Sequence, residues 1–114
     1  MNGMELITAR EHDVQVVWIV ENNNMHGITW HGSKRVGRKV PLECIRYQYP
    51  LEVAAIARAM GLVAWVVDAP DQMQQAVSEA LAISGPSVIE VRIDGSISPP
   101  LGDRARSVAG FIKK

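Results

Sequence analysis

Three short apolar runs constrain most strongly how this chain folds. The runs cover residues 14–20, 63–67 and 87–93, and each has the length of a single strand. Between them lie segments that carry apolar residues at helical spacing. Strands that alternate with helices of about a dozen residues are typical of βαβ units and of a parallel sheet. The sequence therefore predicts an α/β fold, a three-layer domain with a mainly parallel sheet.

Three helices are expected around these strands. One covers residues 3–11, one begins at Pro50 and ends at Gly61, and one begins near Pro70 and ends before Gly85. The spacing of apolar residues predicts the inward stripes of the last two helices, which consist of Val53, Ile56, Ala57 and Met60, and of Met73, Val77, Ala80 and Leu81. Residues 27–49 show no clear period.

The charge balance and the hydropathy pattern exclude several classes of partner. The chain has 12 basic and 12 acidic residues, so no overall field favours nucleic acid or an anionic membrane. No apolar stretch approaches the ~20 residues of a spanning helix, and the first residues lack the features of a signal peptide. A cytoplasmic protein is expected. The single cysteine, Cys44, excludes an intrachain disulfide, and we expect a small buried thiol there.

A run of carboxamides follows the first apolar run directly. Residues 22–28 read Asn-Asn-Asn-Met-His-Gly-Ile, and they come where the first strand is expected to end. Parallel α/β sheets bind ligands at the carboxyl ends of their strands. Amide and backbone carbonyl oxygens are hard ligands suited to Mg²⁺. The alternative is a solvated turn, in which asparagine tolerates a left-handed backbone.

Four segments together resemble one known family. Asn22–Gly27 follows a strand, Met1–Ala9 reads as the helix before it, Ala57–Gly61 has an Ala-x-Ala-x-Gly helix end, and Val88–Val91 reads as a last sheet strand. The chain resembles the C-terminal, diphosphate-binding domain of thiamine diphosphate enzymes such as acetolactate synthase, pyruvate decarboxylase and benzoylformate decarboxylase. The resemblance implies a truncated form of that fold, because the family's Gly-Asp-Gly turn would lie just upstream of Met1.

The resemblance implies thiamine diphosphate and Mg²⁺ as cofactors. Asn23 would give its side-chain oxygen to Mg²⁺, and Met25 would give its backbone carbonyl. The remaining cofactor-binding positions of the motif would be Asn22, His26, Gly27 and Ile28, the last three through N–H groups at a helix start. No residue of the chain is assigned a catalytic role. Residues 1–94 would form a partial cofactor-binding domain, and residues 95–114 a tail with a short helix near Arg104–Phe111.

The function expected from this resemblance is that of a partial domain related to 2-keto acid decarboxylases and acetolactate synthases, inactive by itself. Its partner would be a second copy or a polypeptide that supplies the missing half. The alternative is a non-catalytic interaction module that keeps the fold without the cofactor and self-associates through a sheet edge.

Other polar groups favour ordinary structural roles. A local basic cluster is typical of a solvated loop, although contact with nucleic acid stays open; it consists of Lys34, Arg35, Arg38 and Lys39. The histidines at 12, 26 and 31 and Cys44 do not have the spacing of common zinc sites. The tryptophans at 18, 30 and 65 are expected in the core or in an interface.

Overall fold

The computed structural model describes residues 3–98 of the 114. The helices and strands in this part are α1 (Glu5–Glu11), β1 (Val17–Asn22), α2 (Gly27–Arg35), the 3-10 turn η1 (Leu42–Cys44), α3 (Val53–Ala59), β2 (Val63–Val67), α4 (Gln72–Ala82) and β3 (Ser87–Arg92). The short helix expected near residues 104–111 lies outside the described residues.

The contacts within the chain group its residues into two units. Of the described residues, the sheet unit contains 3–22 and 51–93, and the loop unit contains 23–50 and 94–98. The division into residues 1–94 and 95–114 that the sequence suggested stays a prediction. Each unit is described by itself below.

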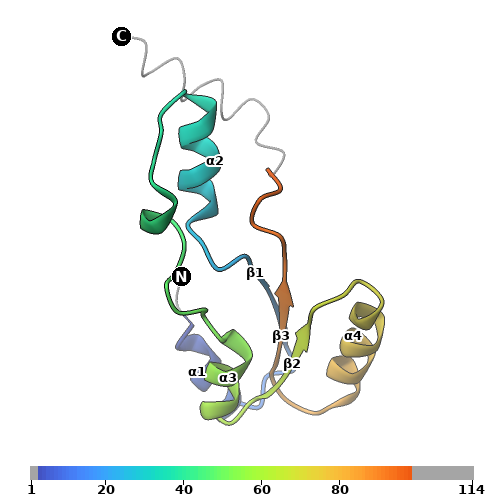
Figure 1. Cartoon of the computed structure of the whole chain (residues 1–114). Coiled ribbons are helices and arrows are strands. Elements are labelled where there is room, and N and C mark those ends of the chain that lie inside the picture. The colour runs from blue at the N-terminus through green and yellow to red at the C-terminus, as the bar shows by residue number, and fades with distance from the viewer. Residues whose placement is uncertain (1–2, 99–114) are drawn as a thin grey trace. The chain divides into compact units, whose positions relative to one another are not determined.

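The sheet unit is built on three parallel strands in the order β1-β3-β2 (Figure 1). Ser87 at the start of β3 lies opposite Val17 on one side and Val63 on the other. The last strand in the sequence is therefore the middle strand of the sheet. This arrangement confirms the predicted α/β fold with a parallel sheet.

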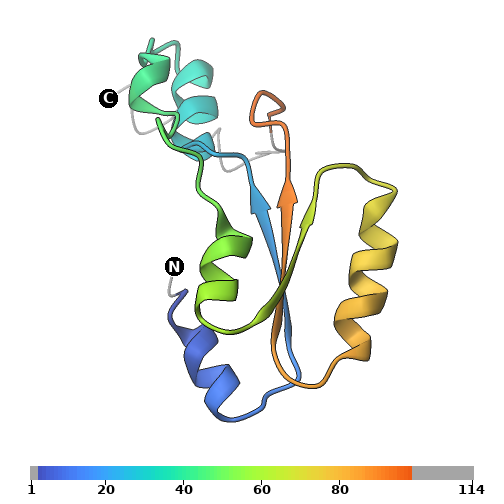
Figure 2. The same ribbon diagram turned by 60° about the horizontal axis from the view of Figure 1, so that its bottom comes forward.

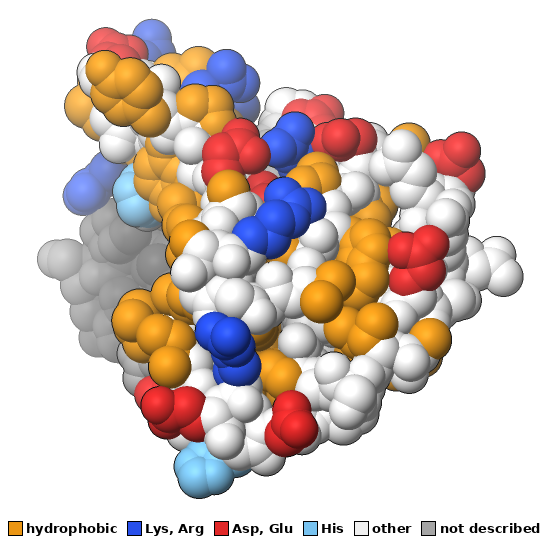
Figure 3. All heavy atoms as spheres, turned by 90° about the horizontal axis from the view of Figure 1, so that it is seen from below, with side chains coloured by type: hydrophobic (Ala, Val, Ile, Leu, Met, Phe, Trp, Pro, Cys, Tyr) orange, Lys and Arg blue, Asp and Glu red, His pale blue; other side chains and the backbone are white. Residues whose placement is uncertain are grey.

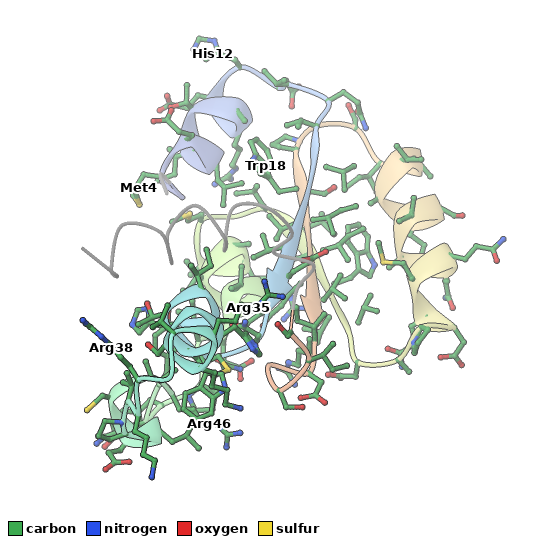
Figure 4. The ribbon with its side chains drawn as sticks, turned by 90° about the horizontal axis from the view of Figure 1, so that it is seen from above. Met4, His12, Trp18, Arg35, Arg38 and Arg46 are labelled. Atoms are coloured by element: carbon green, nitrogen blue, oxygen red, sulfur yellow. The ribbon has the colours of Figure 1, made fainter. Side chains whose placement is uncertain are left out.

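Helices cover both faces of this sheet (Figure 2). On one face α1 and α3 pack against the strands around a core of Ala54, Ala57, Leu62, Ala64 and Val88. On the other face α4 packs against β2 and β3 around a core of Val67, Ala76, Ala80 and Ile89. The three layers match the expected architecture. Trp18 joins the first core and lies between α1 and β1 in Figure 4.

The most deeply buried helix positions in the two sheet cores are taken by alanines. Ala57 and Ala80 were expected in the inward stripes, whereas Ala54 and Ala76 were not. Ile56 and Leu81, both expected in these stripes, are 44% and 66% exposed. Because an alanine lets the helix backbone approach the sheet closely, the bulky neighbours are displaced to the flanks of each helix.

The first strand also differs from its expected position. It runs from Val17 to Asn22 and so begins three residues after the start of the apolar run at 14–20. Val14, at the start of that run, is 46% exposed. Ile19 is 52% exposed, although helices were expected over both faces of this strand. α4 packs against β2 and β3, so the α4 side of β1 is only partly covered. The shift matters because it places Asn22 inside the strand.

Candidate functional site

Asn22 ends β1 with its side chain directed into the sheet unit. The residue is 7% exposed, and its Nδ2 donates to Glu90 Oε1 at 2.6 Å and to the Leu51 carbonyl at 2.7 Å. The Ile93 N–H donates to the Asn22 carbonyl at 3.0 Å. The side chain thus ties the end of β1 to β3 and to the segment before α3. A role for Asn22 in cofactor binding stays a prediction.

Glu90 is a buried carboxylate in the middle strand. Its side chain is fully enclosed, and besides Asn22 it accepts a hydrogen bond at Oε2 from the Ala54 N–H at 2.7 Å. The Arg92 guanidinium lies 3.9 Å from Oε1. A buried carboxylate needs such partners because its desolvation is costly. The available signal in the sequence was an acidic residue between apolar neighbours in a buried strand.

The Asn23–Met25 turn opens the loop unit. The Asn23 Oδ1 accepts the Met25 N–H at 3.2 Å, which is an Asx turn. Asn24 has a φ of 51°, in the left-handed region that asparagine tolerates better than most residues. Met25 is 7% exposed and pairs with Arg46 in an antiparallel bridge. The segment is therefore an asparagine turn with one left-handed residue, and its partly to fully buried residues differ from the solvated turn that was the alternative.

His26 and Gly27 join this turn to α2. The Gly27 N–H donates to the Met25 carbonyl at 2.9 Å across His26, whose φ and ψ of −78° and 67° define an inverse γ-turn. A Cβ on Gly27 would lie 2.6 Å from the Asn23 Nδ2. Only glycine lets the Asn23 carboxamide lie this close to the start of the helix.

The oxygens of this turn suit a hard divalent cation. Asn23 Oδ1 and the Met25 carbonyl each accept one backbone N–H, and a carbonyl oxygen has a second lone pair for a further partner. Amide and carbonyl oxygens are ligands that Mg²⁺ takes readily. The chemistry of these two oxygens therefore suits a magnesium ion. The assignment of Asn23 and Met25 as its ligands stays a prediction.

The N–H groups at the helix start are not equivalent. The His26 N–H donates to the Ile45 carbonyl at 2.9 Å, and the Gly27 N–H is used in the γ-turn. The Ile28 N–H belongs to the first turn of α2, where N–H groups have no acceptor within the helix and attract anions. Of the three predicted positions, Ile28 has the N–H best suited to a phosphate oxygen.

The rest of the loop unit presents aromatic and basic side chains. The His26 and Tyr47 rings meet edge to face with centroids 5.1 Å apart, and the Lys34 Nζ lies 4.2 Å from the Trp30 ring. The four residues of the basic cluster are exposed, and Arg38 points away from the ribbon in Figure 4. Cys44 is exposed, so the expected buried thiol is wrong. It lies in η1, a single surface turn that buries none of its residues.

A second turn lies against the first within the loop unit. The Ser96 N–H and hydroxyl donate to the two carboxylate oxygens of Asp94 at 2.8 and 2.9 Å. These hydrogen bonds, the backbone one first, lower the pKa of Asp94 below its usual value, and the charge of Arg46 acts in the same direction. Gly95, between them, approaches Asn23 and Met25. The sequence analysis assigned Gly95 and Ser96 to the tail and Asp94 to the domain before it.

A separate hollow lies in the sheet unit at the carboxyl ends of the strands. It has a volume of about 440 Å³, and its apolar lining includes Ile19, Val67, Met73 and Val91, with Glu21, Asp68 and Arg92 among the polar lining residues. Arg92 is held by Glu52 at 2.7 Å and by Asp68 at 3.5 Å. On the face drawn in Figure 3, acidic and basic side chains are scattered among apolar ones, and neither charge forms a patch.

Comparison with known proteins places this geometry in a family. Residues 1–91 match the family described as thiamine pyrophosphate enzyme, C-terminal TPP binding domain; thiamine pyrophosphate is another name for thiamine diphosphate. The chain is 33% identical over 100 residues to a Mycobacterium tuberculosis protein named as an acetolactate synthase large subunit, IlvB2. It is 30% identical over 103 residues to the acetolactate synthase large subunit IlvG of the same organism.

These alignments cover 88% and 87% of this chain but only 18% of each relative. Among residues 3–98, no helix is long and apolar enough to cross a membrane. The family match includes β1, the Asn23–Met25 turn and most of β3, the segments that carried the resemblance. The chain therefore belongs to the family of C-terminal TPP-binding domains of thiamine pyrophosphate enzymes and resembles the acetolactate synthases among them.

Proposed function

We propose that this chain supplies the asparagine half of a magnesium–thiamine diphosphate site in an enzyme that acts on 2-keto acids. Asn23 Oδ1 and the Met25 carbonyl bind Mg²⁺, and the first turn of α2 faces the diphosphate. The observation that carries the proposal is the Asn23–Met25 turn, which holds two hard oxygens by backbone N–H groups at the start of a helix. When bound, the cofactor supplies the carbanion chemistry of the reaction.

The residues of this chain bind and orient in this proposal. Gly27 admits the Asn23 carboxamide, and Asn22 with Glu90 fixes the end of β1 that leads into the turn. We assign no proton-handling group and no further Mg²⁺ ligand to this sequence. We therefore expect the 114 residues to be inactive alone and to work with a polypeptide segment, or a second copy, that completes the site.

A hybrid protein tests the assignment of Asn23. In the hybrid, this chain replaces the matching segment of the Mycobacterium tuberculosis relative IlvB2. Calorimetry then measures thiamine diphosphate binding at several Mg²⁺ concentrations. Asn23→Ala removes the side-chain ligand and should lower Mg²⁺-dependent affinity at least about tenfold, the lower end of what a change near a metal costs. Asn24→Gly is the matched control, because it removes a neighbouring carboxamide while glycine keeps the positive φ.

The result would contradict the proposal if Asn23→Ala bound the cofactor as the unchanged hybrid does, or if Asn24→Gly lost as much affinity as Asn23→Ala. A change of Met25 to leucine gives a further check. Because only its backbone carbonyl is a proposed ligand, Met25→Leu should keep most of the affinity.

A second candidate function is self-association without the cofactor. The observation that favours it is the α4 side of β1, where Ile19 is 52% exposed beside the apolar hollow of the sheet unit. A parallel sheet is usually covered on both faces. A second copy of the chain would cover this surface, and the mass of the chain in solution would then be that of a dimer.

A further inference from the structure

We propose that His31 is a positioning residue for the Mg²⁺ ligands, and that it acts by holding the Asp94–Ser96 turn against the back of the Asn23–Met25 turn. The inference rests on the proposed function, since it concerns the same pair of ligands. It adds residues that lie outside the asparagine motif, and one of them, Gly95, lies outside the segment that matches the family.

The first link is a hydrogen bond from a buried histidine. His31 is the buried residue of α2, at 5% exposure, and its Nε2 lies 3.0 Å from the Gly95 carbonyl oxygen. A carbonyl only accepts, so Nε2 carries the hydrogen and donates it. The buried residue of this nine-residue helix is therefore polar. Because burial of an imidazole without a partner is costly, the hydrogen bond to Gly95 accounts for its position.

The second link is the close approach of Gly95 to the ligand turn. A Cβ on Gly95 would lie 3.1 Å from the Asn23 carbonyl oxygen and 3.2 Å from the Met25 Cγ, and it would overlap the Met25 sulfur. A Cβ on Gly27 would likewise meet the Asn23 carboxamide. Both glycines therefore pack closely on the turn that carries the proposed ligands, and a larger residue at either position would displace Asn23 or Met25.

The third link is the rigidity of the segment that His31 holds. Ser96 closes the Asp94 carboxylate with two hydrogen bonds, and the Ile97 N–H returns to the Asp94 carbonyl at 3.3 Å. A preformed turn transmits the position of Gly95 to its neighbours better than an open chain would. Outer residues that orient metal ligands in this way commonly change metal affinity about 10- to 100-fold when they are removed.

The test compares three variants in two measurements. His31→Leu keeps a similar volume and removes the donor, His31→Gln restores an N–H donor of similar reach, and His12→Leu removes an exposed imidazole at the end of α1 (Figure 4). Amide hydrogen exchange of the full 114-residue chain, without metal or cofactor, reports on the Met25 and Gly27 N–H groups. Calorimetry of the hybrid described above reports Mg²⁺-dependent thiamine diphosphate affinity.

We expect His31→Leu to speed exchange of the Met25 and Gly27 amides at least about tenfold while the β3 amides stay protected, and to weaken Mg²⁺-dependent affinity about 10- to 100-fold. His31→Gln should recover most of the amide protection and most of the cofactor affinity. His12→Leu should change neither the exchange rates nor the affinity. The inference is overturned if His31→Leu leaves both readouts unchanged, or if His31→Gln is as impaired as His31→Leu, because ring packing alone would then explain the loss.

Two further results separate this inference from the proposed function. Suppose that the unchanged hybrid binds no cofactor, but that His31→Leu still speeds exchange of the Met25 and Gly27 amides. The function proposed for the turn then fails, whereas the structural role of the His31–Gly95 hydrogen bond is supported. If His31→Leu does not fold, Gly95→Ala tests the same contact from the other side. It should disturb the Met25 and Gly27 amides, whereas Gly32→Ala, with nothing within 4 Å of its added Cβ, should not; equal effects of the two would overturn the inference.

Discussion

The enclosed carboxylate of Glu90 shows how single residues connect the sheet to the end of the first strand. It accepts hydrogen bonds from a side-chain amide of β1 and from a backbone N–H at the start of α3, and its exposure is 0%. Both donors are in fixed positions and have little access to water. A charge in this place is tolerated because both of its oxygens have hydrogen-bond donors.

We predict that Glu90→Gln lowers the free energy of unfolding by about 1–3 kcal/mol, because a glutamine presents one N–H₂ group to donors that need an acceptor. Urea unfolding measures the change. Glu11→Gln, on the exposed side of α1, is the control and should stay within about 0.5 kcal/mol. An unchanged unfolding midpoint for Glu90→Gln would mean that the carboxylate is not needed by its two donors.

The sequence named the proposed ligands Asn23 and Met25 but not the long-range hydrogen bonds around them, and the reason is physical. Asn23 and Met25 could be named because they follow an apolar run within a recognisable motif. Glu90 and Asn22 are 68 positions apart, and His31 and Gly95 are 64 apart. Such pairs form only when the chain folds, and no local spacing announces them.

Helix ends and helix faces decide how the elements of the sheet unit meet. Arg10 at the end of α1 donates from Nη1 to the Met60 carbonyl at 2.8 Å, at the carboxyl end of α3. Gly61 follows with a φ of 81°, and the guanidinium lies where its Cβ would be. A cation beside exposed carbonyls stabilises a helix end. The contact joins two helices on the same face of the sheet.

We predict that Gly61→Ala destabilises the chain by more than the ~1–2 kcal/mol of a left-handed backbone alone, because the new methyl also displaces Arg10. In a chain that already carries Arg10→Ala, Gly61→Ala should lower the free energy of unfolding only by the cost of the left-handed backbone. Thermal unfolding of the two single variants and the double variant separates these contributions. Strict additivity would show that Arg10 does not occupy this position in solution.

At the element scale, the order and type of the strands and of the helices around them followed from the sequence, but which residues face inward followed less well. The period of 3.6 residues located α3 and α4 and placed Ala57 and Ala80 inward. It did not show that Ala54 and Ala76 would also be buried while Ile56 and Leu81 lie outward. The helix within residues 27–49 could not be predicted from apolar periodicity, because α2 buries a histidine and has no apolar stripe. Its role depends on residues from the far end of the described chain.

On the scale of the whole molecule, the chain alternates between its two units. It leaves the sheet unit after Asn22, returns at Leu51 and leaves again at Asp94. The proposed ligands Asn23 and Met25 therefore belong to the loop unit, whereas Asn22 belongs to the sheet unit. The peptide bond between Asn22 and Asn23 is where the cofactor motif crosses from one unit to the other.

The exposed surface around Ile19, on the α4 side of β1, leads to a prediction about dimer formation. If a second copy covers it, Ile19→Lys should convert a dimer to a monomer, because burial of an unpartnered ammonium in an apolar contact is costly. Light scattering over a range of protein concentrations measures the mass. Ile56→Lys, at a comparably exposed position of α3, is the control and should leave the mass unchanged. A monomeric unchanged chain at high concentration would remove self-association as a function.

The position of β3 in the middle of the sheet also has a consequence for synthesis. β1 and β2 each pair with β3, so a nascent chain on the ribosome has neither ladder until residues 87–92 have emerged. The apolar runs of the first two strands must wait through roughly seventy and twenty further residues of translation before they find a neighbour. For this chain β3 acts as the closing step in the assembly of the described sheet, and a message cut short before Ser87 would yield a product that lacks both of its ladders.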